Sequence, residues 1–571
     1  MSLFNRLSYS QKVVFLEHYY DNPSNVSDEN LEAILNSFPF HDSSQEKNLN
    51  FLTIKLLRKL KENINIERLA EKLKTDIYTT KEILNRESFE VYFPIAKEGK
   101  ADLNKLLVIP LNSDRILSTE PVDINSLEAI KKLIGRGFFI TFSKNFDFKT
   151  NSYTLALYSV LEFGNLASKF AFTGRLTTEG KIESVEYVNE KVKVCRENRI
   201  PIIFPQKGNM ESVEDLREFL TNLEIPVFIF PSSKIRKETF MDIFKFSQDY
   251  IKSVFHIDAE LNYTDIFNES NLTGSFANYS RWLENLGTIL KTLKEEYLPN
   301  LRVGLTSNPL VFSFFAGVVL SKKRLSVNFY KYFKEGQVYK PIFTIKDDRD
   351  IPDTDTVKDF VKKEGKSGDT IVITSRESKS NGGIVIKLPS GTKLDKYSKE
   401  LAFYVNNLIR SLEDKCYDLI LETSNDFAFA LGYFLEDYKC INLLHKGRFA
   451  YSIRDSLQKP YYLTNAFSLN MINFKKVYIV VEELDIELVK EKLEEYGFIS
   501  YISHESTAQV LKDLLGKEIE TNRKNLKLKK GDRLMVFQIL VRPEEGQVFS
   551  KEEIEKIVKD KKYKFFEVLI S

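Results

Sequence analysis

Residues 498–545 read FISYISHESTAQVLKDLLGKEIETNRKNLKLKKGDRLMVFQILVRPEE. The apolar run 498–502 predicts a buried strand, and apolar residues then recur at helical spacing up to Gly516, a typical helix end. His504 is therefore expected where a strand turns into a helix, beside free backbone N–H groups that favour anions. A second apolar strand, 533–541, leads to Arg542 and Glu545. The stretch predicts a small α/β domain with charged side chains at the ends of its elements.

The residue types at these ends suit a phosphodiester ligand. His504 and Glu545 can exchange protons, and Arg523 and Arg542 can each hold a phosphate with two hydrogen bonds. The alternative reading is a solvated basic loop with a histidine that merely caps a helix, because charged runs usually lie on the surface.

Together with YLTNAFSLNM at 462–471, this stretch resembles the ring nuclease family first known as viral anti-CRISPR proteins. The resemblance runs from about Tyr461 to the C-terminus and includes the Ser-His-Glu-Ser-Thr-Ala segment. It implies cleavage of cyclic tetra-adenylate, in which the ribose 2′-hydroxyl is the nucleophile and no metal is needed. The roles that it implies are acid–base chemistry for His504 and Glu545, ligand contacts for Ser468 and Asn470, and phosphate binding for Arg523 and Arg542.

Composition limits the other possibilities. The chain has 571 residues, which predicts several domains, and 83 Lys and Arg against 81 Asp and Glu give a net charge of only +2. Such balance argues against coating long nucleic acid. Three scattered cysteines predict neither a disulfide framework nor a CxxC metal site, so we expect no metal and a reducing cytoplasm. No secretory or membrane-spanning segment is expected.

Residues 1–90 predict a helical N-terminal region. Within it, 66–73 and 79–84 read as two short amphipathic helices joined by a polar turn. Such a pair can be a DNA-reading helix-turn-helix, but the same pattern is common in helices that only pack or dock a partner. Both interpretations remain open from the sequence.

Residues 91–231 predict an α/β domain. Ser152 stands at an expected helix start, 170–174 reads Phe-Ala-Phe-Thr-Gly, Lys191 belongs to a Glu-Lys pair, and 200–205 is an apolar strand that ends in proline. This order resembles the proteolytic domain of Lon proteases, and it implies that Ser152 is a nucleophile and Lys191 its general base.

A serine hydroxyl becomes a useful nucleophile only when a base removes its proton, and lysine acts as that base only when burial keeps it neutral. The alternative is that Ser152 simply caps a helix. Lys149-Thr150-Asn151 replaces the Gly and Pro that this family has before its serine, which leaves activity and the base open. Lys193 is the alternative base.

Residues 232–456 contain an internal repeat. The strand and loop LRVGLTSN at 301–308 is followed by an apolar helix, and YDLILETSN at 417–425 is followed by another. Each copy predicts a strand, a polar loop and a helix, hence two Rossmann-like halves whose loops and helix N-termini meet a shared ligand. The candidate ligand-binding residues are Thr306, Ser307, Asn308, Thr423, Ser424 and Asn425. Simple helix capping is the alternative.

This part resembles the SAVED domain, a fusion of two CARF-like halves that senses cyclic oligonucleotides. The four expected parts are therefore 1–90, 91–231, 232–456 and 461–571, in a multidomain α/β chain. Together they resemble the CRISPR-associated Lon-SAVED proteases of type III systems with an added ring nuclease.

The resemblance implies a ligand-driven homo-oligomer, activated by cyclic tetra-adenylate, that cleaves a partner protein until the C-terminal domain, itself expected to be dimeric, destroys the activator. No cofactor is expected beyond that activator. Two rival interpretations are a non-proteolytic cyclic oligoadenylate sink and a DNA-binding regulator. The protease target, the ring size and any ligand cleavage by the sensor are not specified by the sequence.

Overall fold

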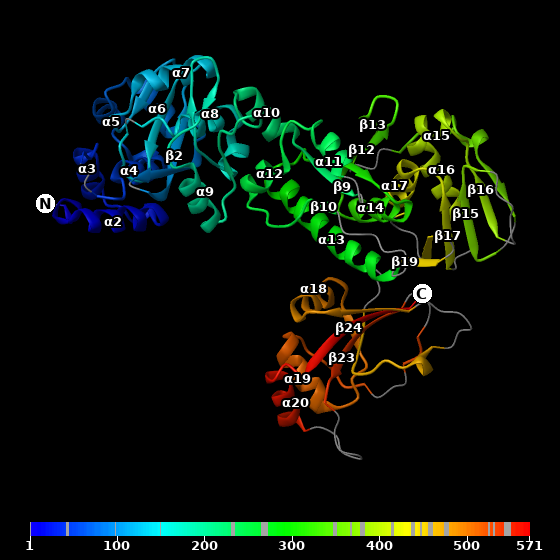
Figure 1. Cartoon of the computed structure of the whole chain (residues 1–571). Coiled ribbons are helices and arrows are strands. Elements are labelled where there is room, and N and C mark those ends of the chain that lie inside the picture. The colour runs from blue at the N-terminus through cyan, green and yellow to red at the C-terminus, as the bar shows by residue number, and fades with distance from the viewer. Residues whose placement is uncertain are drawn as a thin grey trace. The chain divides into compact units, whose positions relative to one another are not determined.

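The computed structural model describes residues 2–570 except 42–44, 98, 149, 230–233, 264–271, 347–350, 366–367, 377–382, 413–415, 436–439, 446–447, 455–460, 473–478, 523–525, 529–531 and 542–549. It is a multidomain α/β chain with several sheets, as expected (Figure 1). The chain divides into two compact units. Unit 1 comprises Met1–Pro226, Met241–Ala259 and Thr292–Arg302, and unit 2 comprises Val227–Phe240, Glu260–Lys291 and Val303–Ser571.

Unit 1 is built on a mixed six-stranded sheet in the order β3-β4-β2-β1-β5-β8. Its strands are β1 (Phe89–Lys97), β2 (Lys100–Pro110), β3 (Ile116–Ser118), β4 (Phe138–Phe142), β5 (Ala171–Phe172) and β8 (Ile202–Ile203), and a separate pair is formed by β6 (Arg175–Leu176) and β7 (Ile182–Glu183). β1, β5 and β8 run parallel to one another.

The helices of unit 1 are α1 (Leu3–Arg6), α2 (Tyr9–Asp21), α3 (Asp28–Ser37), α4 (Leu49–Lys59), α5 (Ile66–Leu73), α6 (Ile77–Asn85), α7 (Ile124–Ile134), α8 (Thr154–Phe163), α9 (Val188–Glu197), α10 (Val213–Asn222) and α12 (Gln248–Phe255). α8 is buried from Thr154 to Leu161, because its apolar residues are distributed around the helix and are not confined to one face. α9 instead buries one stripe, Lys191 and Cys195, which are one turn apart.

The N-terminal helices share one hydrophobic core with the sheet. Leu107, Ile109 and Phe139 of β2 and β4 belong to the same buried cluster as the apolar residues of α2 to α6. α6 is tied down at its start, where Arg115 forms a 2.7 Å ion pair with Asp76. The expected helix pair is present, and its packing favours a structural role over DNA reading.

Unit 2 contains three sheets, of which two form the repeated halves. The first is ordered β10-β9-β11-β12-β13 and the second β14-β16-β15-β17-β18-β19. The strands are β9 (Glu224–Ile229), β10 (Asn262–Tyr263), β11 (Arg302–Ser307), β12 (Ser326–Phe333), β13 (Val338–Ile345), β14 (Lys362–Glu364), β15 (Thr370–Thr374), β16 (Ile384–Lys387), β17 (Tyr417–Glu422), β18 (Cys440–His445) and β19 (Arg448–Arg454).

The repeat predicted from the sequence is confirmed at the level of its elements. β11 leads into helix α14 (Leu310–Lys322), and β17 leads into α17 (Asn425–Phe434). The other helices of the two halves are α11 (Lys234–Met241), α13 (Leu272–Thr292), α15 (Thr392–Lys396) and α16 (Ser398–Arg410).

Helices α14 and α17 pack directly against each other at two glycines. A Cβ on Gly317 would lie 2.1 Å from the Phe429 carbonyl oxygen, and a Cβ on Gly432 would lie 1.9 Å from the Phe314 carbonyl oxygen. The backbones approach so closely that only glycine fits at either position. The two halves are therefore joined through one tight helix pair.

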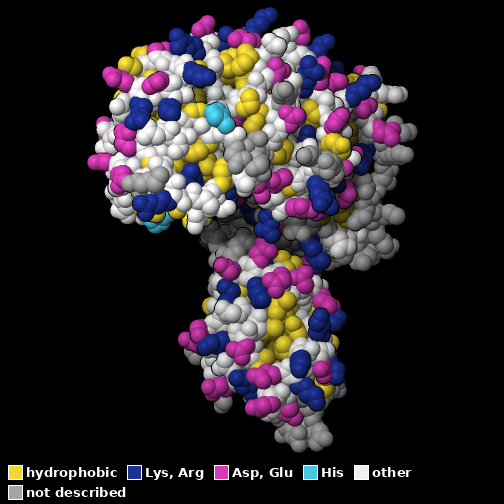
Figure 2. Space-filling view, turned by 90° about the vertical axis from the view of Figure 1, so that its left-hand side faces the viewer, with side chains coloured by type: hydrophobic (Ala, Val, Ile, Leu, Met, Phe, Trp, Pro, Cys, Tyr) yellow, Lys and Arg dark blue, Asp and Glu magenta, His cyan; other side chains and the backbone are white. Residues whose placement is uncertain are grey.

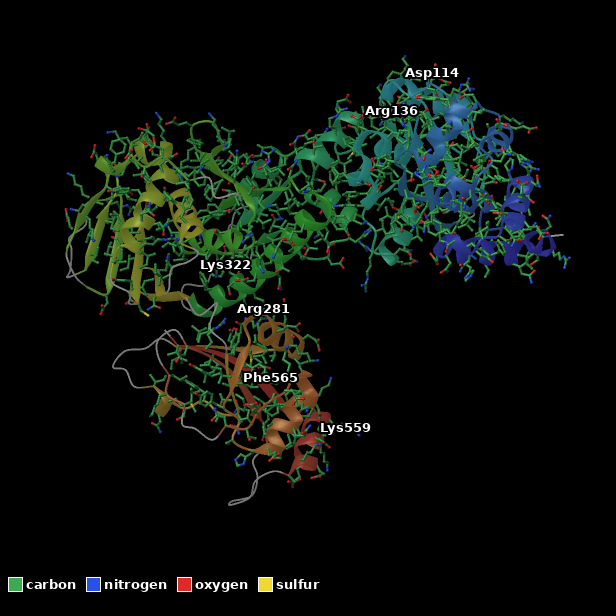
Figure 3. All side chains as sticks on the ribbon, turned by 180° about the vertical axis from the view of Figure 1, so that it is seen from behind. Asp114, Arg136, Arg281, Lys322, Lys559 and Phe565 are labelled. Atoms are coloured by element: carbon green, nitrogen blue, oxygen red, sulfur yellow. The ribbon has the colours of Figure 1, made fainter. Side chains whose placement is uncertain are left out.

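The C-terminal sheet of unit 2 is ordered β21-β24-β23-β20-β22. Its elements are β20 (Tyr461–Thr464), β21 (Ile479–Leu484), β22 (Phe498–Ser500), β23 (Arg533–Ile539), β24 (Tyr563–Ile570), α18 (Ile486–Tyr496), α19 (Glu505–Leu515) and α20 (Lys551–Lys559). Separate apolar clusters occur here, and the larger contains Phe565 of β24, labelled in Figure 3.

Two further findings concern cysteines and membranes. Cys416 is disulfide-bonded, although the scattered spacing of the three cysteines predicted no disulfide framework, because cysteine spacing along the chain does not report which cysteines meet in the fold. Cys195 is a buried free thiol. Within the described ranges, we find no helix with both the length and the apolar character that a membrane crossing requires.

Candidate functional site

The C-terminal sheet brings three of the predicted site residues, Ser468, Asn470 and His504, to one edge. β20 runs parallel to both β22 and β23, so the carboxyl ends of these three strands lie on the same side. Ser468 and Asn470 follow β20, and His504 follows β22. The carboxyl edge of parallel strands is where such sheets bind ligands.

His504 is the residue that immediately precedes α19, and its side chain is exposed. The imidazole forms no hydrogen bond with the first turn of the helix, so it does not act as a side-chain cap. The helix-capping interpretation of His504 is therefore not realised, and the ring is accessible beside the N-terminus of α19.

The loop after β20 is held by local bonds. The Ser468 hydroxyl accepts the Asn470 backbone N–H at 3.3 Å, and the Lys527 ammonium donates to the Asn470 carbonyl at 3.3 Å. The Ser468 and Asn470 side chains are both exposed.

Asn522 ties a third segment to this edge. Its side-chain amide donates to the Ser500 carbonyl at 2.9 Å, and its backbone N–H donates to the Ile502 carbonyl at 2.8 Å. Three predicted residues, Arg523, Arg542 and Glu545, lie outside the described residues.

A buried ionic network stiffens the same sheet. Glu567 accepts a hydrogen bond from the Tyr461 hydroxyl, and its other carboxylate oxygen lies 3.1 Å from the Lys492 ammonium. Arg533 stacks on the Tyr461 ring. Burial acts to raise the pKa of Glu567, but the Lys492 charge and the Tyr461 hydrogen bond outweigh it and hold that pKa below its ordinary value.

The twin loops of the repeat meet each other. The Asn425 amide nitrogen donates to the Asn308 side-chain oxygen at 3.3 Å, so the two Thr-Ser-Asn segments lie side by side. Thr306 and Ser307 are buried, and the Ser307 hydroxyl bonds to Ser313 at 2.7 Å. In the first loop, Asn308 is thus the candidate with a partly exposed side chain.

The second loop is more open. Thr423, Ser424 and Asn425 are all partly exposed as residues, yet the Thr423 and Ser424 hydroxyl oxygens are buried and find no hydrogen-bond partner among the residues that the structure describes. Ser424 directly precedes α17 but does not cap it with its side chain. Unpaired buried hydroxyls are costly, which favours a ligand-binding role over simple capping.

Sequence reasoning missed two charged residues directly behind these loops. Asp426, in the first turn of α17, is buried and accepts a hydrogen bond from Ser398. Lys331 of β12 lies 3.7 Å from Asp426 and also pairs with Asp395 of α15. The pairing joins the first half to the second. The signal in the sequence was the acidic residue after the second Thr-Ser-Asn, which the first copy lacks.

In unit 1, Ser152 lies beside the Thr173-Gly174 segment that was expected to accompany it. The Gly174 backbone N–H donates to the Ser152 carbonyl at 3.3 Å. Ser152 is buried and stands one residue before the cap of α8, which is Tyr153, so Ser152 is not a helix cap.

Lys191 and Lys193 differ in their surroundings. Lys191 is only 4% exposed, on the buried stripe of α9, whereas the Lys193 side chain is exposed. Burial lowers the pKa of Lys191, partly opposed by Glu186. A short connection joins α9 to β8, and β8 runs parallel to β5. The first turn of α9 therefore lies at the edge where Thr173 follows β5.

Three buried polar atoms in the segments that flank or contact Ser152 have no hydrogen-bond partner among the described residues. They are the Asn151 side-chain oxygen, the Tyr153 hydroxyl and the Thr173 hydroxyl. Burial, with smaller contributions from Asp123 and Glu120, raises the pKa of Tyr153. Buried polar atoms are normally paired, so each unpaired one could be stabilised by a further polar group.

Charge on the surface is mixed. Figure 2 shows Lys and Arg interspersed with Asp and Glu over the visible face, without a continuous basic area. In the parts that the structure describes, no group of three His, Cys, Asp or Glu side chains is placed to hold a metal ion.

Comparison with known proteins identifies the C-terminal part. The STIV B116-like family model matches residues 461–565. Protein 26 of Sulfolobus islandicus filamentous virus is 39% identical over 97 residues, which cover 17% of this chain and 82% of that protein. YddF of Bacillus subtilis is 30% identical over 103 residues, covering 18% of this chain and 92% of YddF.

Two solved structures are also similar. B116 of Sulfolobus turreted icosahedral virus is 34% identical, with a TM-score of 0.17, covering 19% of this chain and 98% of B116. The Acinetobacter baumannii Cap4 SAVED/CARF-domain receptor, solved with the cyclic trinucleotide 3'3'3'-cAAA, is 9% identical, with a TM-score of 0.27, covering 64% of this chain and 93% of the receptor.

The expected viral resemblance is thus confirmed as a family assignment. Through residues 461–565, the chain belongs to the STIV B116-like family.

Proposed function

We propose that the C-terminal domain is a ring nuclease that opens cyclic tetra-adenylate. The observation that carries this proposal is the STIV B116-like family membership of residues 461–565, in which the exposed His504 stands at the carboxyl edge of parallel strands. The exposed side chains of Ser468 and Asn470 at that edge support it further.

The proposed reaction uses the ligand's own nucleophile. A ribose 2′-oxygen forms a bond to the adjacent phosphorus while the bond from phosphorus to the 5′-oxygen breaks, which leaves a 2′,3′-cyclic phosphate and a 5′-hydroxyl. His504 and Glu545 share two proton transfers: one side chain accepts the 2′-hydroxyl proton, and the other delivers a proton to the leaving 5′-oxygen. Arg523 and Arg542 neutralise the charge on the phosphate.

The test is cleavage of labelled cyclic tetra-adenylate by the full chain. We expect His504→Ala to lose at least about 100-fold in rate, the low end of what a proton-transfer group contributes. His18→Ala, a matched change in α2 of unit 1, should cleave at the wild-type rate. Equal rates for His504→Ala and the wild type would refute the assignment.

We further propose that the twin loops sense the same ligand. The Asn308–Asn425 hydrogen bond and the unpaired Thr423 and Ser424 hydroxyls support a shared anion-binding site at the N-termini of α14 and α17. Ligand binding would activate the chain by favouring an assembled form over the free one.

A second proposed activity is a serine protease with Ser152 as nucleophile and Lys191 as base. The specific support is that Lys191, not Lys193, is buried with a lowered pKa in the first turn of α9, at the edge of β5 that continues into the Thr173-Gly174 segment, which contacts Ser152. The Ser152 oxygen bonds to the peptide carbonyl carbon as its proton passes to the neutral Lys191 amine, and the carbon–nitrogen bond breaks as that proton is delivered to the leaving amine. A water molecule, deprotonated by Lys191, then hydrolyses the acyl ester and restores the Ser152 hydroxyl.

These proposals combine into one antiviral effector of the type III CRISPR kind. Cyclic tetra-adenylate would bind the twin loops, drive homo-oligomer formation and permit cleavage of a partner protein until the C-terminal domain destroys the signal. A protein-cleavage assay distinguishes this effector from a sink that only degrades ligand. An effector would cleave a protein and lose that cleavage in Ser152→Ala, whereas a sink would cleave no protein. The packing of α6 onto the sheet leaves the DNA-binding regulator without specific support.

A further inference from the structure

The N-terminal helical region holds the loop that carries Ser152. Residues 45–48, here called the strap, lie just before α4, and residues 143–148, here called the serine loop, follow β4 on the way to Ser152 in the chain. Lys47 and Lys144 form an antiparallel β-bridge between the two segments.

Hydrogen bonds reinforce this bridge on both sides. The Asn145 backbone N–H donates to the Glu46 carbonyl at 2.8 Å, and the Asn48 backbone N–H donates to the Ser143 carbonyl at 3.0 Å. The Asn145 side-chain amide also donates to the Gln45 carbonyl at 2.8 Å. An exposed ion pair of Lys144 and Glu46 adds little by comparison.

The strap is itself anchored in a buried position. The Asn48 side chain is 3% exposed and donates to the carboxylate of the buried Glu120 at 2.7 Å. Thr119 and Thr141 also donate to that carboxylate, at 2.6 and 3.0 Å. The strap therefore cannot shift without breaking a buried polar network, which is costly.

Aromatic packing carries this restraint to the candidate nucleophile. Phe146 follows Asn145 directly, and its ring centroid lies 4.6 Å from that of Phe148 and 6.2 Å from that of Tyr153. Tyr153 is fully buried and is the neighbour of Ser152. A displacement of the serine loop would thus move the backbone on which the Ser152 hydroxyl is placed.

We infer that Asn145, through its bonds to the strap, is a positioning residue for Ser152, and that the N-terminal helical region is a built-in support of the protease site. The inference rests on the proposed protease function. It gives residues 1–90 a role that needs no nucleic acid.

A fluorophosphonate probe tests this on the full chain without knowledge of the protein target. The Ser152 oxygen forms a bond to phosphorus, fluoride leaves, and the hydroxyl proton passes to the Lys191 amine. The end point of labelling counts competent sites, and the maximal labelling rate reports how well Ser152 is placed. Labelling is followed with and without cyclic tetra-adenylate, and peptide mapping locates the label.

We expect Asn145→Ala to lower the maximal rate about 10-fold, and Asn145→Asp, which sets a carboxylate against strap carbonyls, about 100-fold, as a misplacement of about 1 Å can do. The end point, the probe concentration at half-maximal rate and the ring cleavage rate should all stay at wild-type values. A merely structural role would instead lower the end point. Asn30→Ala, which removes a side-chain bond from α3 to the Phe4 backbone elsewhere in the helical region, is the matched control and should label normally.

The outcomes separate the two proposals. Labelling of the wild type that is lost in Ser152→Ala but unchanged in Asn145→Ala and Asn145→Asp would overturn the positioning role and leave the protease standing. An absence of label at Ser152 in the wild type under both conditions would overturn both.

Discussion

The contact between α14 and α17 predicts that one added methyl group will separate the two loop-bearing halves. A Cβ at position 432 would lie 1.9 Å from the Phe314 carbonyl oxygen, whereas ordinary contact begins near 3.4 Å, so the helices must move apart by about 1.5 Å. The obstacle is backbone on a buried helix, which cannot rotate away as a side chain can.

We expect Gly432→Ala to destabilise the paired halves by about 3 kcal/mol, the upper end of the usual cost of overpacking. For a part of this size, that corresponds to a melting midpoint lowered by roughly 6–12 °C. The Asn308–Asn425 bond lies at the N-terminal ends of the same two helices, so affinity for cyclic tetra-adenylate should fall at least about 10-fold, the equivalent of roughly 1.4 kcal/mol.

The assay is thermal unfolding together with calorimetric ligand titration, both in a His504→Ala background so that the ligand persists. Gly287→Ala in α13 is the control, because the nearest atoms to its new methyl group are side-chain carbons of Lys323 and Val319 at 3.2 and 3.3 Å. That control should change stability by less than about 1 kcal/mol. Wild-type melting and affinity in Gly432→Ala would refute the tight helix pair as the basis of the shared site.

Two other predictions concern charged residues. Lys191→Met should abolish probe labelling of Ser152, whereas Lys193→Met should retain it, and loss of labelling in Lys193→Met alone would reverse the assignment. The labelling rate of the wild type should rise with pH through a midpoint below 10.5, because the pKa of Lys191 is lowered and only the neutral amine accepts a proton. Glu567→Gln should destabilise the C-terminal domain by about 2 kcal/mol, because the buried Glu567 would lose its charge-assisted hydrogen bonds with Lys492 and Tyr461. The pKa of Glu567 is lowered in the native state, so its contribution to folding stability is complete above the ordinary pKa of 4.5 and is lost as the pH falls through the native pKa. In acid-unfolding titrations, the stability of the wild type should therefore fall towards that of the variant.

Much of the fold follows from local pattern. The two copies of strand, polar loop and apolar helix are visible in the sequence because the apolar residues of β11 and α14 are contiguous in the chain, as are those of β17 and α17. The same holds for β22 and α19, which place His504 at a strand-to-helix junction as expected.

The candidate sites were predicted less completely, because their geometry depends on contacts between distant segments. The choice between Lys191 and Lys193 needed the packing of α9 on the sheet. The bond between Asn308 and Asn425 spans 117 residues, and the strap reaches the serine loop across about 100 residues. Nothing in the local sequence encodes such pairings. The ranges of the four predicted domains stay predictions, and Met241–Ala259, inside the range expected for the sensor, belongs to unit 1.

The central claim is that this chain both responds to a cyclic oligoadenylate and destroys it. The most direct measurement is to incubate the purified full chain with labelled cyclic tetra-adenylate and to follow the label and the size of the protein together. The account predicts rapid ring opening by the wild type, an intact ring with His504→Ala, and larger assemblies that persist only in that variant. An intact ring after incubation with the wild type would contradict it.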